Sequence, residues 1–296
     1  MRAAAIGFEG VDLARADVNG LSIAYEVIGS GSRAVAITPG GRFSKDTPGV
    51  RGLATELASA GLKVLIWDRV NAGESDIHFD AESESILNAD TLGGLLRRIG
   101  FGPALLVGGS AGSRVSLMTS IRHPDTVSGL FLLWISGGPI GLGVLASHYH
   151  YDSAHAALTG GMEAVANLPT WQESLARNPG NRARILAQNP LTFVRTMQQW
   201  AKSFLPTIDT PVPGVTPEQL GKIGVPTVVL RSGTTDVHHT RETSEKLAAL
   251  IPGAKLIEPP WGDNEWNERM VSGEPLFARW PKLAPLIVDA ASKIKV

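Results

Sequence analysis

The sequence predicts an α/β fold in which a mostly parallel central sheet has helices on both faces and carries a helical cap insertion. Two observations predict this fold class. Strand-like segments alternate with segments of helical periodicity, and the strand-like segments are apolar along both faces, as in a buried parallel sheet. The alternation stops between residues 140 and 213, where no strand is expected and the last residues are rich in proline. We therefore expect a core of residues 1–139 and 214–296 and a helical cap of residues 140–213.

The predicted elements are short and bounded by residues that end strands and helices. Residues 21–27 alternate between apolar and polar positions, which is typical of a half-buried strand near a sheet edge. Gly61 and Gly100 follow helical segments, where glycine commonly ends a helix. The predicted strands are residues 21–27, 34–38, 63–67, 104–107, 128–135, 225–231 and 255–258. The predicted helices are residues 50–60, 89–99, 113–121 and 240–250, with a final helix after residue 280.

The composition excludes several classes of function. The chain has 296 residues, and its 27 basic and 28 acidic residues nearly cancel, so neither nucleic acid nor an anionic membrane is an expected partner. The absence of cysteine excludes disulfides, thiolate metal sites and cysteine nucleophiles. Residues 1–10 lack the apolar segment of a secretory signal, and no apolar run approaches the roughly 20 residues that span a bilayer. We expect a cytoplasmic protein, monomeric or homodimeric, with a small-molecule substrate and no cofactor.

The strongest local motif is a glycine-flanked serine, Gly108-Gly-Ser110-Ala-Gly112, between a predicted strand and a predicted helix. A serine in this sharp turn is exposed, and the glycines on either side prevent side-chain collisions. The helix that follows directs its N–H groups and its positive dipole end toward the serine. The motif predicts that Ser110 is a nucleophile. The alternative is a glycine-rich connection in which the serine is incidental.

The motif and several other stretches together resemble the α/β-hydrolase superfamily. The stretch TPGGR at residues 38–42 resembles the oxyanion loop, with Pro39 in place of the usual histidine. WDRVNAGESD at residues 67–76 resembles the loop that follows the next strand. VPTVVLRSGTTD at residues 225–236 resembles the strand and turn that supply the triad acid, and IPGAKLIE at residues 251–258 the strand before the triad histidine. The resemblance covers nearly the whole chain outside the cap.

The resemblance implies roles for three further residues. The backbone N–H groups of Gly41 and Ala111 would form the oxyanion hole, where donors act on charge as it develops. Asp236 would be the triad acid. The plainer alternatives are an ordinary tight turn at Gly41 and a turn-capping aspartate at Asp236.

The chain departs from the family at the triad histidine. The family pattern places it near Asp263 or Asn264, and no histidine follows His239. One possibility is that a histidine elsewhere in the chain is the base. His239, three residues after Asp236, is then the first candidate, ahead of the cap histidines at 148, 150 and 155. A second possibility is a non-hydrolytic lyase, isomerase or ligand-binding protein with a degenerate triad. A third is an inactivating histidine-to-asparagine substitution at position 264.

The remaining chemistry-bearing residues indicate a binding pocket rather than a metal site. Arg42, Trp134 and Trp261 are predicted to line the substrate pocket, and Arg114 either to bind a carboxylate or to pair with the loop at residues 68–76. No histidine and carboxylate group has firm metal-ligand spacing. The resulting hypothesis is a serine-dependent hydrolase of a small apolar ester, lactone or C–C bonded diketone, which acts through an acyl-enzyme.

Overall fold

The computed structural model describes residues 14–205 and 211–294. The expectation for residues 1–10 and that for the proline-rich stretch at 206–210 lie outside the described residues. No helix within the described ranges is long and apolar enough to cross a lipid bilayer.

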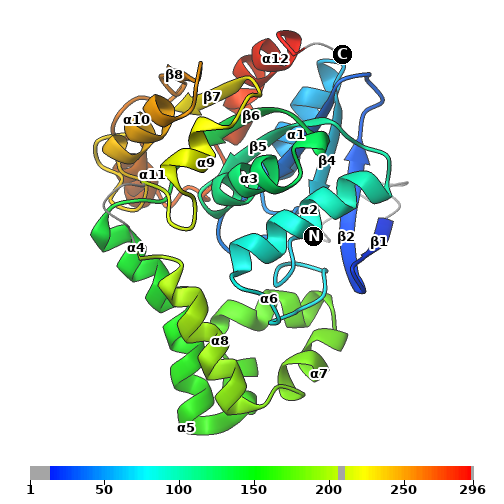
Figure 1. Cartoon of the computed structure of the whole chain (residues 1–296), viewed down its shortest axis with the longest axis vertical. Helices are drawn as coiled ribbons and strands as arrows, with labels where there is room; N and C mark the ends of the chain where they lie inside the picture. Colours follow the sequence, from blue (N-terminus) through cyan, green and yellow to red (C-terminus); the bar gives the residue numbers. More distant parts are fainter. Residues whose placement is uncertain (1–13, 206–210, 295–296) are drawn as a thin grey trace, which may run out of the picture.

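An eight-stranded sheet forms the centre of the molecule (Figure 1). Its strand order is β1-β2-β4-β3-β5-β6-β7-β8. β1 and β2 run antiparallel to their neighbours, and every other pairing is parallel. The strands are β1 (Ala14–Val18), β2 (Leu21–Ile28), β3 (Ala34–Thr38), β4 (Lys63–Trp67), β5 (Ala104–Gly109), β6 (Val127–Leu133), β7 (Thr227–Leu230) and β8 (Lys255–Ile257).

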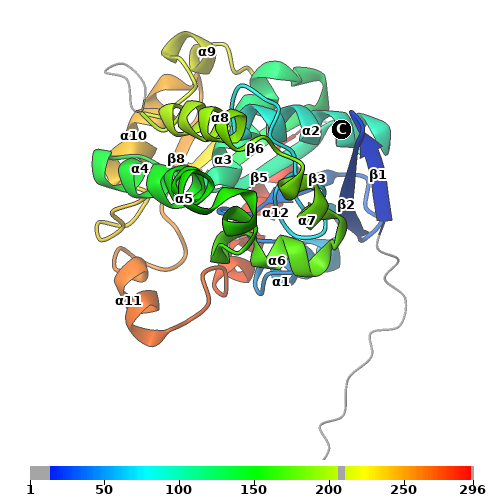
Figure 2. The same ribbon diagram turned by 90° about the horizontal axis from the view of Figure 1, so that it is seen from below.

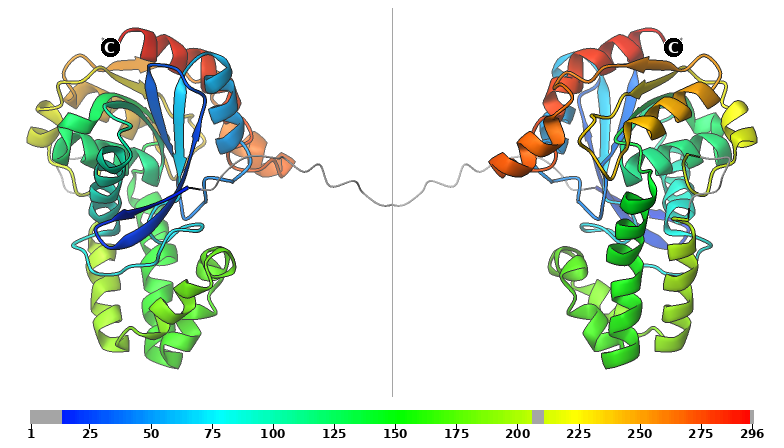
Figure 3. Two further views of the ribbon diagram at one scale, coloured as in Figure 1. Left: turned by 90° about the vertical axis from the view of Figure 1, so that its right-hand side faces the viewer. Right: turned by 90° about the vertical axis from the view of Figure 1, so that its left-hand side faces the viewer.

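Helices cover both faces of the sheet, which buries the apolar strands on two sides (Figure 3). One face packs against α2 (Glu84–Arg98), α3 (Ala111–Arg122) and α10 (Arg241–Leu250), and the other against α1 (Val50–Ser59) and α12 (Ala284–Ser292). The remaining core helices are α9 (Pro217–Gly221), α11 (Glu265–Ser272) and the short 3₁₀ turns η1 (Pro124–Thr126) and η3 (Trp280–Leu283). The predicted fold class is confirmed.

A separate helical lobe, which we call the cap, lies between β6 and β7 in the sequence (Figures 1 and 2). Its helices are α4 (Pro139–Ala146), a π-helical turn η2 (Ser147–Tyr151), α5 (Asp152–Ala166), α6 (Pro169–Arg177), α7 (Gly180–Leu186) and α8 (Pro190–Lys202). Trp171, Phe193 and Trp200 form its core together with Phe79 from the loop before α2. The cap therefore shares one apolar cluster with the core domain.

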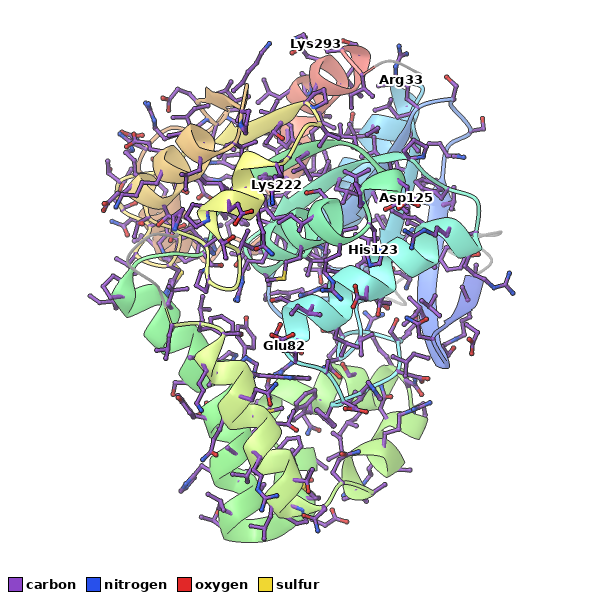
Figure 4. All side chains as sticks on the ribbon, viewed as in Figure 1. Arg33, Glu82, His123, Asp125, Lys222 and Lys293 are labelled. Atoms are coloured by element: carbon purple, nitrogen blue, oxygen red, sulfur yellow. The ribbon has the colours of Figure 1, made fainter. Side chains whose placement is uncertain are left out.

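Hydrogen bonds also tie the cap to the segment before α2. The indole Nε1 of Trp200 donates to the carbonyl of Ala81 at 2.9 Å, and Gln199 Nε2 donates to the carbonyl of Glu82 at 2.9 Å. Glu82 lies where the lobe meets the core domain (Figure 4). These contacts hold the cap beside the end of the sheet from which the loops after β3, β4 and β5 emerge.

The predicted strands match the structure to within two residues at each end, but several core elements differ from the prediction: helices α9 and α11, for example, were not predicted. Strand β1 was not predicted. Helix α2 begins at Glu84 rather than near residue 89, because the Ser83 hydroxyl accepts a hydrogen bond from Ile86 N at 3.2 Å and caps an additional turn.

Candidate active site

Ser110 occupies a strained turn between β5 and α3. Its backbone angles are φ 57° and ψ −120°, a conformation that is rare for residues other than glycine. A Cβ atom at Gly108 would lie 2.4 Å from the carbonyl oxygen of Gly112, and one at Gly112 would lie 2.0 Å from that of Thr38. Both positions therefore require glycine, and the strand and helix close tightly around the serine.

His239 connects Ser110 to Asp236 through two hydrogen bonds. Its Nδ1 lies 2.8 Å from Asp236 Oδ2, and its Nε2 lies 2.8 Å from Ser110 Oγ. A carboxylate only accepts hydrogen bonds, so Nδ1 carries the proton and Nε2 is left to accept the proton of the serine. This is the geometry of a nucleophile, a base and a residue that orients the base.

Asp236 and His239 lie on one loop, between β7 and α10, and Asp236 determines the conformation of this loop. Asp236 Oδ1 accepts hydrogen bonds from the backbone N–H groups of His238 at 2.9 Å and His239 at 3.0 Å. Oδ2 remains available to the imidazole. The side chains of Asp236 and His239 are 3% and 6% exposed, so their hydrogen bond is shielded from water.

Two tryptophans enclose the imidazole of His239. The ring of Trp134, directly after β6, lies near parallel to it at 23° with a centroid distance of 6.1 Å, and Trp266 meets it edge-on at 5.4 Å. The Arg269 guanidinium lies 4.5 Å from the centre of the Trp266 ring and pairs with Glu265 at 3.1 Å. This packing restricts the rotation of the histidine ring.

The residues predicted for the oxyanion hole lie beside Ser110. Ala111 is the first residue of α3, so its N–H has no acceptor within the helix. Gly41 follows Gly40, whose position is so close to the serine that a Cβ there would lie 2.7 Å from Ser110 Cβ. Arg69 Nη2 donates to the Gly40 carbonyl at 3.2 Å and holds this loop in place.

A pocket between the core domain and the cap contains Ser110. It is lined by Gly41, Arg42, Arg69, Glu84, Ser85, Asn88, Ser110, Ala111, Arg114, Val115, Ser136, Leu145, Tyr149, Ser203 and Phe204. Arg42 is one of these lining residues, whereas Trp134 and Trp261 are not. They line a small separate hollow beside Asp236. The Trp134 ring is buried in the core near Phe277 and Trp280, and Trp261 is partly buried and packs against Trp134.

Comparison with known proteins identifies the fold. No protein-family model matches the chain. Over 126 residues it is 32% identical to a 2-hydroxy-6-oxononadienedioate/2-hydroxy-6-oxononatrienedioate hydrolase from Burkholderia vietnamiensis, which covers 40% of this chain and 42% of the relative. The chain thus spans only about half the length of the curated relatives it matches.

The solved structures agree over nearly the whole chain. The enol-lactonase from Burkholderia xenovorans LB400 has a TM-score of 0.58 at 21% identity, covering 95% of this chain and 100% of that one. An alpha/beta hydrolase enzyme from a Medee basin deep-sea metagenome library has a TM-score of 0.62 at 16% identity, covering 96% and 98%. This chain has the α/β-hydrolase fold.

Asn264, where the sequence pattern of the superfamily would place the triad histidine, forms no hydrogen bond with Ser110, whose Oγ contacts His239 and Ser136 among the described residues. Asn264 is exposed at the start of α11, a helix that projects at the periphery of the molecule (Figure 2). Asp263 is 55% exposed and pairs with Arg241. Of the cap histidines, His148 and His155 are exposed. The described histidine that reaches the serine is His239.

Arg69, Glu84 and Tyr149 line the pocket although the sequence did not predict them there. Arg69 follows Asp68 in the WDRVNAGESD loop. The resemblance of this loop to the family was the feature of the sequence that could have indicated Arg69 as a site residue. Arg114 pairs with no described residue of that loop. Its Nη2 donates instead to the carbonyls of Ser203 at 2.9 Å and Pro213 at 3.3 Å, which lie after α8.

The side chain of His150 is buried between Trp200 and Phe204. From this burial we predict that the stability of the fold depends on pH. His150 is fully buried and neither ring nitrogen has a hydrogen-bond partner among the described residues. Burial lowers its pKa from 6.5 to about 3, with a smaller contribution from Arg42 and Arg114 and an opposing one from Glu84. The unfolded chain therefore binds a proton that the folded chain does not, and stability falls as the pH drops from about 6.5 toward 3.

We expect the free energy of unfolding to lose about 1.4 kcal/mol per pH unit through His150 between roughly pH 6 and pH 4. Urea unfolding of the wild type and of His150→Phe across this range measures the effect. The slopes of stability against pH should differ by this amount, since the other titrating groups are common to both proteins. Equal slopes would show that the histidine is protonated in the folded state.

Within the described residues no three His, Cys, Asp or Glu side chains are grouped so that they could hold a metal ion. The site brings together the Ser110 hydroxyl, the His239 imidazole and the Asp236 carboxylate, with the arginines and Glu84 of the pocket around them.

Proposed function

We propose that this chain is a serine-dependent hydrolase of a small ester, lactone or C–C bonded diketone, with Ser110 as nucleophile, His239 as base and Asp236 as the residue that orients the base. The observation that carries the proposal is the pair of 2.8 Å contacts that places His239 between Asp236 and Ser110. The similarity to an enol-lactonase and to a hydrolase of 6-oxo acids supports the same class of reaction.

For an ester or lactone the steps follow from this geometry. Ser110 Oγ attacks the carbonyl carbon while its proton moves to His239 Nε2, and the carbonyl oxygen becomes an oxyanion held by the N–H groups of Gly41 and Ala111. The C–O bond then breaks, the imidazolium returns the proton to the departing alcohol oxygen, and an acyl-enzyme remains. Water attacks the acyl carbon, with His239 accepting its proton, and releases the acid and free Ser110.

Labelling with a fluorophosphonate probe tests the nucleophile. We expect the wild type to be labelled at one site, Ser110→Ala to be unlabelled, and His239→Ala to be labelled much more slowly, because the imidazole no longer accepts the serine proton. Hydrolysis of a short 4-nitrophenyl ester should follow the same order. A wild type that neither labels nor hydrolyses would instead support the non-hydrolytic alternative, and labelling of Ser110→Ala would exclude Ser110.

A further inference from the structure

The pocket around Ser110 contains more positive charge than the protein neutralises. Arg42, Arg69 and Arg114 all line it, and Glu84 is the one carboxylate among its described lining residues. The Arg42 side chain is 8% exposed, and Arg69 and Arg114 are 6% and 1% exposed. Arginine stays protonated in proteins, so an excess of two positive charges is buried beside the nucleophile.

The charge state of the pocket follows from its surroundings. Burial lowers the pKa of Arg114 to about 10, which still leaves it charged at neutral pH. Burial favours the neutral form of Glu84, but the charge of Arg42 and a 3.0 Å hydrogen bond from Asn71 outweigh it and lower the pKa of this carboxyl. The Glu84 carboxyl is therefore negatively charged, and among the described residues it forms an ion pair with Arg42, at 3.4 Å.

Arg69 and Arg114 form no ion pair within residues 14–205 and 211–294. The Nε donors of Arg42, Arg69 and Arg114 are buried without a hydrogen-bond partner among the same residues. The Nη2 groups of Arg69 and Arg114 donate to backbone carbonyls, which satisfy hydrogen bonds but carry no net charge. The charge of Glu84 acts on both arginines from beyond ion-pair distance, and that of Asp68 on Arg69. Glu84 alone among the described lining residues does not balance three guanidinium groups, and a buried charge that is not fully compensated is destabilising, so the pocket favours an anion.

We propose that this pocket binds a carboxylate carried by the substrate, so that the protein hydrolyses a carbonyl compound with an anionic end rather than a wholly apolar one. The inference rests on the proposed hydrolase function. The three arginines come from separate elements around the oxyanion loop: Arg42 directly follows Gly41, Arg69 bonds to Gly40, and Arg114 stands one helical turn after Ser110. A carboxylate held by these guanidinium groups lies close to the carbonyl that Ser110 attacks.

Paired substrates test the charge preference. Mono-4-nitrophenyl adipate is compared with its amide isostere, 4-nitrophenyl 5-carbamoylpentanoate, in which a neutral group of the same shape replaces the carboxylate. We expect kcat/KM to be at least about tenfold higher for the acid, as one charged contact supplies. In Arg114→Gln this ratio should fall about tenfold, and in Arg114→Lys it should fall less because the charge remains.

Arg122→Gln is the matched control, because Arg122 lies on the same helix but pairs with Asp90 at the surface and should keep the wild-type ratio. If Arg114 only fastens the cap, Arg114→Gln slows both esters equally, the ratio stays constant and the proposal is overturned. A wild-type ratio near one overturns it without any variant, which covers the case in which Arg114→Gln does not fold.

Binding without turnover separates this inference from the proposed function. Calorimetric titration of Ser110→Ala with adipate should show binding that its diamide, adipamide, lacks and that weakens as salt is added. If both esters are inert and no fluorophosphonate label is incorporated while adipate binds, the hydrolase proposal fails and the anion site stands. If the esters are hydrolysed and adipate does not bind, the anion site fails alone.

Discussion

Replacing His239 by glutamine is expected to lower kcat/KM for ester hydrolysis by about 10⁴- to 10⁶-fold, the range found when the histidine of a serine triad is lost or misoriented. Glutamine keeps a polar side chain in the enclosure formed by Trp134 and Trp266, but it cannot accept the serine proton. The loss should appear mainly in kcat, because the imidazole does not line the pocket that holds the substrate. Steady-state kinetics on a 4-nitrophenyl ester measure it.

Two matched variants distinguish a base at His239 from a base at position 264. His238→Gln changes the neighbouring histidine, whose ring has no contact with Ser110 among the described residues, and should leave kcat/KM within about threefold of the wild type. Asn264→His restores a histidine at the family position and should have an equally small effect, because that side chain is exposed at the start of α11. A large gain of activity in Asn264→His would show instead that position 264 holds the true base.

The position of His239 illustrates what a sequence can and cannot determine about a site. The spacing of three residues places Asp236 and His239 in one loop, but the spacing alone does not determine where the imidazole ring points. The direction depends on Asp236 Oδ1, which binds the two backbone N–H groups and turns the histidine toward β5. It also depends on Trp266, which reaches the ring from a helix the sequence did not predict.

The fold was more predictable than the pocket, for a physical reason. Buried strands and the glycines of the serine turn leave local patterns in the sequence, because each depends on neighbouring residues. The complete set of charges around Ser110 leaves none. Arg42 and Arg114 were considered because they lie near the two motifs in the sequence, whereas Arg69 and Glu84 belong to a loop and a helix start that only the topology of the sheet brings to Ser110. Strand β1, five residues long, was missed because its residues 14–18 alternate too briefly to signal a strand.

Substituting Gly40 by alanine is the second change with a large expected effect. The added Cβ would lie 2.7 Å from Ser110 Cβ, 3.1 Å from the Gly109 carbonyl and 3.3 Å from Ser110 Oγ. The first of these distances is shorter than real Cβ contacts, so the oxyanion loop or the serine turn must shift. The serine cannot easily yield, since its strained turn is closed by Gly108 and Gly112.

A displacement of the order of an ångström between nucleophile and oxyanion donors costs about 100-fold in rate, so we expect kcat/KM of Gly40→Ala to fall by at least that factor. The loss should fall mainly on kcat, because the displaced N–H of Gly41 acts on the charge that develops in the transition state. Gly143→Ala in the cap helix α4 is the matched control: nothing lies within 4 Å of its added Cβ, so activity should be unchanged. Fluorophosphonate labelling of Gly40→Ala should slow along with hydrolysis. Labelling and turnover at the wild-type rate would mean that the loop of residues 38–42 does not approach Ser110 as closely as these distances require.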